Sequence, residues 1–173
     1  MSNITTSQTI GPFSHEAWQW AVTATQGATL QTTAATVTVR GVIYDGDGVP
    51  VNDAQIEAWL PESAACEAQQ AIPGFRRQPS GEQGQFEFRL SRQAQPAPGE
   101  PAAYITVFAR GLVKHQFTAV FLGDDAGLRE SAILDQVPPA RRATLVAAAQ
   151  PDGSYTWDIH LQGDQETVFF DYK

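Results

Sequence analysis

Residues 102–122 read AAYITVFARGLVKHQFTAVFL and form the longest β-type segment of the chain. On either side of Arg110 and Gly111 the segment is rich in Val, Thr and Phe, and such β-branched and aromatic residues favour strands over helices. The segment therefore predicts two strands that are joined near Arg110 and Gly111.

A second clear strand lies earlier in the chain, at residues 36–45, TVTVRGVIYD, where apolar and polar residues alternate. The DGDG sequence at 45–48 then predicts a turn, with a hairpin-like return into AQIEAWL at 54–60. Acidic residues that alternate with Gly are also found in calcium loops. An EF-hand needs more oxygen ligands, a terminal Glu and flanking helices, so a plain turn is favoured.

Other parts of the sequence extend this all-β pattern. GQFEFRL at 84–90 predicts a strand that leaves a turn, and the Pro-rich residues 91–101 predict a surface loop. Within 128–150, the sequence PPARRATLVAAA predicts one short helix that begins at Pro138 or Pro139. YTWDIHLQG and ETVFFDY predict the last two strands. The spacing predicts an all-β fold with a β-sandwich core of about seven to eight strands, one short helix and long loops.

Composition limits the classes of function. The 173 residues, 42% of them hydrophobic, suit one compact domain, and the net charge of −8 argues against a nucleic-acid-binding protein. The single cysteine, Cys66, excludes an internal disulfide framework and a thiolate zinc site. Neither an export signal nor an 18-residue apolar run is present, so we expect a soluble, cytoplasmic protein without membrane contact.

Residues that commonly carry catalysis are few and dispersed. His15, His115 and His160 form no HxH or HxxxH pair, and a structural role is the favoured interpretation for each. There is no GxSxG sequence, and Cys66 has no basic neighbour that would lower the pKa of its thiol. The sequence therefore predicts no catalytic residue and no metal site in this chain.

Five motifs in order along the chain resemble those of the intradiol ring-cleavage dioxygenases, and most closely those of the α subunits of the protocatechuate-cleaving members. The motifs are SQTIGPF at 7–13, GVIYDGDGVPVNDAQIEAW at 41–59, VFARGL at 107–112, RRATL at 141–145 and LQGDQETVFFD at 161–171. The resemblance implies a β-sandwich and a reaction in which Fe(III) and O2 cleave 3,4-dihydroxybenzoate to 3-carboxy-cis,cis-muconate.

The family's catalytic subunit holds iron through two tyrosines and two histidines, and this sequence lacks all four. Glu67 stands near the position of the first tyrosine, residues 91–99 replace the region of the second, and Ala102 and Tyr104 occupy the two histidine positions. By resemblance this chain is the non-catalytic, iron-free alpha subunit. Its expected partner is a homologous iron-bearing beta subunit, which would hold Fe(III) in an αβ protomer of a larger oligomer.

The resemblance also implies where the chain meets substrate. Residues 1–35 are expected to form an N-terminal arm that contacts the partner, ahead of a β-sandwich domain at 36–173. Thr9 supplies a hydroxyl, Gly11 permits close approach and Pro12 stiffens the loop, so these residues suit one wall of the pocket. The Arg110 guanidinium suits a carboxylate such as that of the substrate. Alternatively, Arg110 forms an ion pair at the subunit interface, and the arm residues only order against the partner.

The sequence departs from the family pattern at one further position, and it leaves a second function open. Thr118 and Ala119 stand where alpha subunits usually carry a Thr-Arg pair. The alternative function is a stand-alone β-sandwich module that binds hydroxybenzoates without chemistry. A supporting subunit should co-purify with an iron-bearing homologue, whereas a stand-alone module should bind hydroxybenzoates by itself.

Overall fold

A computed structural model describes residues 19–26, 35–61, 67, 70–92 and 97–171. The expected site residues Thr9, Gly11 and Pro12, together with His15 and Cys66, lie outside these ranges. The strands are β1 (Ala35–Tyr44), β2 (Gln55–Trp59), β3 (Phe75–Pro79), β4 (Gln85–Arg92), β5 (Ala103–Phe108), β6 (Gln116–Leu122), β7 (Val146–Ala149), β8 (Tyr155–Thr156) and β9 (Ile159–His160). The helical segments are α2 (Gln19–Gln26), η1 (Ala126–Glu130), α3 (Ala132–Asp135) and η2 (Pro139–Leu145), of which η1 and η2 are 3-10 helices.

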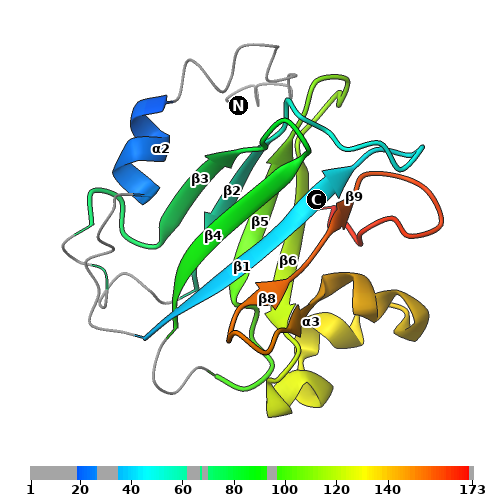
Figure 1. Cartoon of the computed structure of the whole chain (residues 1–173). Helices are drawn as coiled ribbons and strands as arrows, with labels where there is room; N and C mark the ends of the chain where they lie inside the picture. Colours follow the sequence, from blue (N-terminus) through cyan, green and yellow to red (C-terminus); the bar gives the residue numbers. More distant parts are fainter. Residues whose placement is uncertain (1–18, 27–34, 62–66, 68–69, 93–96, 172–173) are drawn as a thin grey trace, which may run out of the picture.

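The strands form one almost closed sheet in the order β3-β2-β5-β6-β7-β8-β1-β4, and β9 pairs with β1. Figure 1 shows β1 and β4 lying across β2, β5 and β6, so the sheet is folded into two layers. Alternate side chains of these strands point into the space between the layers, where Ile43, Ile56, Phe86, Ile105 and Val107 are almost fully buried. The prediction of an all-β sandwich is confirmed.

The predicted strand pair at 102–122 is β5 and β6, which pair antiparallel from Ala103↔Val120 to Val107↔Gln116. The predicted strand at 36–45 is β1, which pairs antiparallel with β4 over its first eight residues. The hairpin-like return is only partly correct. The backbone N–H of Asp45 donates to Val49 O, but β2 then crosses into the other layer and pairs with β3 and β5.

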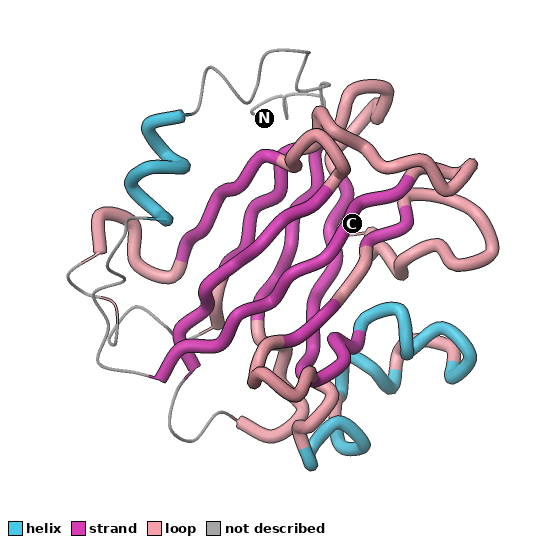
Figure 2. The backbone as a smooth tube through the Cα atoms, in the orientation of Figure 1, coloured by secondary structure: helices cyan, strands magenta, loops and turns pink. Residues whose placement is uncertain are grey.

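The helical content differs from the prediction. The expected helix at PPARRATL is the 3-10 segment η2, and within the described residues η1, α3 and α2 add further helical turns. Figure 2 shows the turns of η1, α3 and η2 together at one end of the sheet and α2 on the opposite side, next to β3. Leu134, Val137 and Leu145 pack there against Phe121, so the buried positions of this segment follow contacts with β6 rather than one α-helical face.

The strand predictions need three corrections. β3 was not predicted, and β7 falls in residues that were assigned to the helix. ETVFFDY does not form a strand within the described residues up to Asp171, although Phe170 makes an isolated antiparallel bridge with Phe117. Among the described residues, no helix is long and apolar enough to cross a membrane.

Candidate functional site

Arg110 is the sequence-predicted site residue that the structure describes, and it lies in the turn between β5 and β6. Its side chain is 71% exposed, and its Nε lies 2.9 Å from Oδ2 of Asp53, a residue in the turn before β2. Arg110 thus forms an ion pair within the chain, through the Nε edge of the guanidinium, and the alternative of an ion pair at the subunit interface stays a prediction. Among the residues that the structure describes, Asp53 is the acidic group paired with Arg110. Sequence reasoning missed Asp53 as the partner of Arg110, because it lies 57 positions away in the motif at 41–59, and the two motifs meet only when β2 pairs with β5.

A cluster of three aromatic rings supports the base of the same turn. The His115 ring lies 5.3 Å from the Phe108 ring and 4.7 Å from the Phe117 ring, measured between centroids. Phe108 and Phe117 flank the turn on β5 and β6, so His115 packs between the two strand ends. This packing agrees with the structural role favoured for His115.

Glu67, which stands near the position of an iron-binding tyrosine in the family, is fully buried and paired with Arg76 of β3. Its Oε2 accepts from Arg76 Nη1 at 3.0 Å and from the backbone N–H of Gly74 at 2.7 Å. Its Oε1 accepts from Arg76 Nη2 and from the Ser91 hydroxyl. Burial raises the pKa of the Glu67 carboxyl, but the hydrogen bonds from Arg76, Ser91 and Gly74 outweigh it and hold the pKa below 4.5.

The Arg76 guanidinium also joins the two open edges of the sheet. Its Nε donates to Arg89 O on β4 at 2.9 Å, and β3 and β4 are the two ends of the strand order. Arg76 itself is 2% exposed. The buried ion pair therefore closes the sandwich at the place where backbone pairing stops.

The structure tests whether the residues at the family's iron-ligand positions fit a metal ion. The Glu67 carboxylate is already paired with the Arg76 guanidinium, and the Ala102 side chain has no atom that could bind a metal. Tyr104 lies opposite Trp59 of β2 and Ala119 of β6 in the sheet. No group of three or more His, Cys, Asp or Glu side chains that suits a metal occurs among the described residues. The three described positions, Glu67, Ala102 and Tyr104, therefore do not fit a ferric ion.

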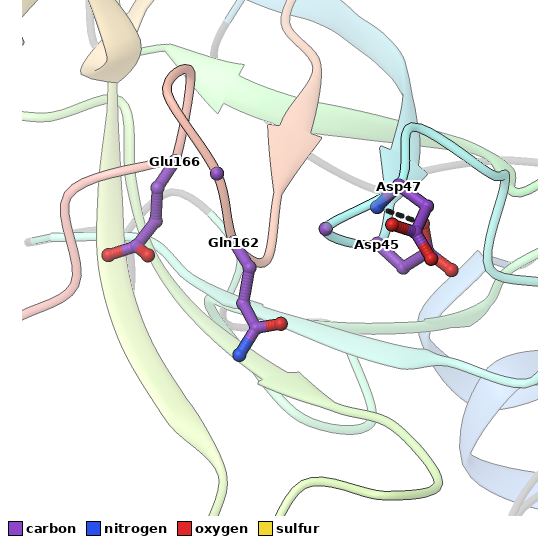
Figure 3. Close-up of a pocket in the computed structure, with 6 residues that line it drawn as sticks. Asp45, Asp47, Gln162 and Glu166 are labelled. Atoms are coloured by element: carbon purple, nitrogen blue, oxygen red, sulfur yellow. Dashed lines mark hydrogen bonds between the residues drawn. The ribbon is translucent and has the colours of Figure 1, made fainter.

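The DGDG sequence forms a turn beside an open depression of about 570 Å3, which Asp45, Gly46, Asp47, Gln162, Gly163 and Glu166 line. Asp45 Oδ1 accepts from the backbone N–H groups of Asp47 and Val49, each at 2.9 Å. Figure 3 shows that the carboxylates of Asp47 and Glu166 point away from each other. The turn interpretation is confirmed, because the Asp45 carboxylate holds the backbone of its own loop.

Two of the motifs that carry the resemblance meet in space. In RRATL, the Thr144 hydroxyl donates to Arg141 O and accepts from the backbone N–H of Val168, and Arg141 Nη2 donates to Glu166 O. The Thr118 hydroxyl donates to Val168 O at 2.8 Å. RRATL thus fixes the ETVFFD segment along β6, and Phe169 and Phe170 pack against the two core clusters. These contacts are those expected of a terminal core segment.

Comparison with known proteins shows which proteins this chain resembles. No protein-family model matches the sequence. The protocatechuate 3,4-dioxygenase alpha chain of Burkholderia cepacia is 37% identical over 150 residues, which cover 78% of this chain and 76% of the relative. The protocatechuate 3,4-dioxygenase alpha chain of Pseudomonas putida is 30% identical over 152 residues, which cover 79% and 76%.

Solved structures share the fold at low sequence identity. The dioxygenase domain of a dioxygenase carbohydrate-binding protein fusion from Streptomyces sp. SirexAA-E has a TM-score of 0.61 at 17% identity, over 79% of this chain and 85% of that one. Catechol 1,2-dioxygenase from Acinetobacter sp. ADP1 has a TM-score of 0.55 at 18% identity, over 87% and 60%. With this fold and with 30–37% identity to two alpha chains, the chain belongs to the protocatechuate 3,4-dioxygenase alpha chains of the intradiol dioxygenases.

Proposed function

We propose that this chain is the iron-free alpha subunit that helps to form the pocket in which a beta subunit's Fe(III) and O2 cleave 3,4-dihydroxybenzoate to 3-carboxy-cis,cis-muconate. The observation that carries the proposal is the 37% identity to a named alpha chain across most of both sequences. That identity favours a supporting subunit over a stand-alone module for hydroxybenzoates.

The buried Glu67–Arg76 pair supports the assignment of the iron to the partner. An Arg guanidinium is always protonated at neutral pH, so the Glu67 carboxylate is already neutralised by a cation that belongs to the chain. A metal ion at Glu67 would have to displace Arg76 into the interior without a counter-ion, which is strongly unfavourable. The alpha chain therefore contributes shape and charge to the reaction, and the partner contributes the metal.

The pocket contribution is assigned to Thr9, Gly11, Pro12 and Arg110. The substrate carries a ring carboxylate, and Arg110 presents an exposed guanidinium whose Nη1 and Nη2 atoms suit two-point binding of such a group. Thr9, Gly11 and Pro12 belong to the expected arm of residues 1–35, which we propose contacts the partner. Gly11 and Pro12 would form a close, stiff wall against the planar ring.

The designation alpha chain implies a second kind of chain in the same enzyme. We assign that place to a homologous, iron-bearing beta subunit in an αβ protomer that assembles further, working in the cytoplasm. The exposed turn between β5 and β6 supports this assembly, because Val113 is 84% exposed beside Arg110 and Lys114. An exposed apolar tip with the Lys114 cation beside it suits a partner surface that offers a carboxylate next to an apolar contact.

Co-purification tests the assembly. We would express this chain with an affinity tag, alone and together with the candidate beta subunit, and determine the mass of each eluted species. The proposal expects both chains at equal amounts in one complex. A beta subunit that is stable and fully active without this chain would contradict the proposal.

A further inference from the structure

Asp53 differs in environment from the arginine that it contacts. The Asp53 side chain is 22% exposed, whereas that of Arg110 is 71% exposed, and the contact of 2.9 Å uses Arg110 Nε. A largely covered carboxylate thus holds the inner edge of a largely exposed guanidinium. Among the described residues, none is paired with the outer edge of the guanidinium, so Nη1 and Nη2 stay available to bind a ligand.

The backbone that carries Asp53 is firmly held. The next residue, Ala54, is 1% exposed. Its N–H donates to the Ser80 hydroxyl at 3.0 Å, and its carbonyl accepts from the Ser80 backbone N–H at 2.8 Å. β2 begins one residue later, at Gln55, so Asp53 is fixed at the entrance of a central strand.

The backbone of Arg110 is also set by its turn, but its side chain is not. Ala109 is buried, the N–H of Leu112 donates to Ala109 O at 3.2 Å, and Gly111 has a φ of +92°. The Arg110 side chain extends from this corner through four rotatable bonds, and holding such a side chain in one orientation costs conformational entropy. An anchor at Nε removes most of that freedom and still leaves the Nη edge to bind.

We propose that Asp53 is a positioning residue that fixes the Arg110 guanidinium in the orientation needed to bind the substrate carboxylate. The inference rests on the proposed function, because it requires Arg110 to face the substrate. Asp53 also carries a negative charge, which opposes a second carboxylate across the guanidinium. The orienting contact of Asp53 therefore favours binding of the substrate carboxylate, whereas the charge of Asp53 opposes it. Two substitutions separate these two effects.

The experiment uses the assembled complex of this chain with its beta subunit. Asp53→Ala removes both the anchor and the charge, whereas Asp53→Asn removes the charge but keeps a side-chain oxygen in the same place beside Arg110 Nε. Asp171→Ala is the matched control, because Asp171 pairs with Lys114 of the same turn at 3.5 Å and is 67% exposed. Arg110→Ala tests the proposed function itself.

For each variant, kcat and KM are measured with 3,4-dihydroxybenzoate, and the inhibition constant is measured for catechol, which has the same ring diol without the carboxylate. Asp53→Ala should raise KM about tenfold with kcat nearly unchanged. Asp53→Asn should stay within about threefold of wild type, because the anchor remains. The catechol inhibition constant should not change in either variant, and Asp171→Ala should behave as wild type.

Three results would overturn the inference in distinguishable ways. If Arg110→Ala raises KM and Asp53→Ala does not, the positioning role is wrong and the proposed function stands. If Asp53→Ala weakens both compounds equally, Asp53 supports the loop and not the carboxylate contact. If Arg110→Ala has no effect on either compound, the pocket role of Arg110 is wrong, and the positioning role falls with it.

Discussion

Glu67 and Arg76 form an ion pair that is withdrawn from solvent, with the two side chains 0% and 2% exposed. The same guanidinium donates to Arg89 O and to Phe75 O at 2.9 Å, so Arg76 is tied to both β3 and β4. Isolated charges in an interior are unfavourable, and each charge here is tolerated because the other is present. Closure of the sheet between β3 and β4 therefore depends on both members of the pair.

Glu67→Gln should lower the free energy of unfolding by about 3 kcal/mol at neutral pH, because Arg76 then stays buried without a counter-ion. Urea denaturation of the purified variant measures this change. The control is Asp135→Asn, since Asp135 is 62% exposed and lies 3.4 Å from Arg142. It should shift stability by less than about 0.5 kcal/mol. Equal effects for the two variants would show that burial of the Glu67 pair adds no stability.

The stability difference between wild type and Glu67→Gln should depend on pH in a defined direction. Burial raises the pKa of the Glu67 carboxyl, but the hydrogen bonds from Arg76, Ser91 and Gly74 together lower it by more. The folded pKa therefore lies below the ordinary value of 4.5. A depressed carboxyl pKa stabilises the folded state above the unfolded pKa, and this stability is lost as pH falls through the folded pKa. Urea denaturation at a series of pH values should show a constant difference near neutrality that shrinks below pH 4.5. A difference that grows on acidification would contradict this assignment.

Gly41→Ala should destabilise the chain by about 3 kcal/mol, because an added Cβ enters space that another backbone already fills. That atom would lie 1.7 Å from Trp157 O, where the segment between β8 and β9 runs parallel to β1. Thermal unfolding followed by circular dichroism measures the change.

The control for this substitution is Gly48→Ala. Gly48 has a φ of +76° but no atom within 4 Å of the added Cβ, so only backbone strain of about 1 kcal/mol is expected. If Gly41→Ala were as stable as Gly48→Ala, β1 and Trp157 would not approach as described.

Calcium should not stabilise the DGDG turn, and Asp45 should matter more than Asp47. Asp45→Ala removes the acceptor of two backbone N–H groups and should cost about 1 kcal/mol. Asp47 takes part in these bonds through its backbone N–H, which alanine also has, so Asp47→Ala should leave the stability nearly unchanged. The melting temperature of wild type should be the same in calcium and in a chelator. A calcium-dependent rise that Asp47→Ala abolishes would instead indicate a cation site.

Alternating polarity predicted β1 and β4, and a high content of β-branched and aromatic residues predicted β5 and β6. β3 has no such pattern, because Arg76 points inward and its charge is compensated by Glu67, nine positions earlier. Local alternation cannot show a partner of that kind. The 3-10 geometry of η2 was likewise not predicted, since Ala and Arg favour an α-helix, whereas Leu145 at the end of η2 packs with Ala119 and Phe121 of β6.

The candidate site could be predicted in part. Arg110 followed from its motif, and the structure describes it as an exposed side chain with Asp53 at its Nε. Asp53 was not predicted, because residues 53 and 110 meet only when β2 pairs with β5. The roles of Thr9, Gly11 and Pro12 stay predictions, since these residues lie outside the described ranges.

The assignment of the iron to the partner is tested by oxygen uptake with 3,4-dihydroxybenzoate, combined with iron analysis, on this chain alone and on the chain co-expressed with its candidate beta subunit. We expect iron and oxygen uptake in the complex, and neither in the isolated chain. Stoichiometric iron with turnover in the isolated chain would contradict it, because this chain would then hold the catalytic metal itself.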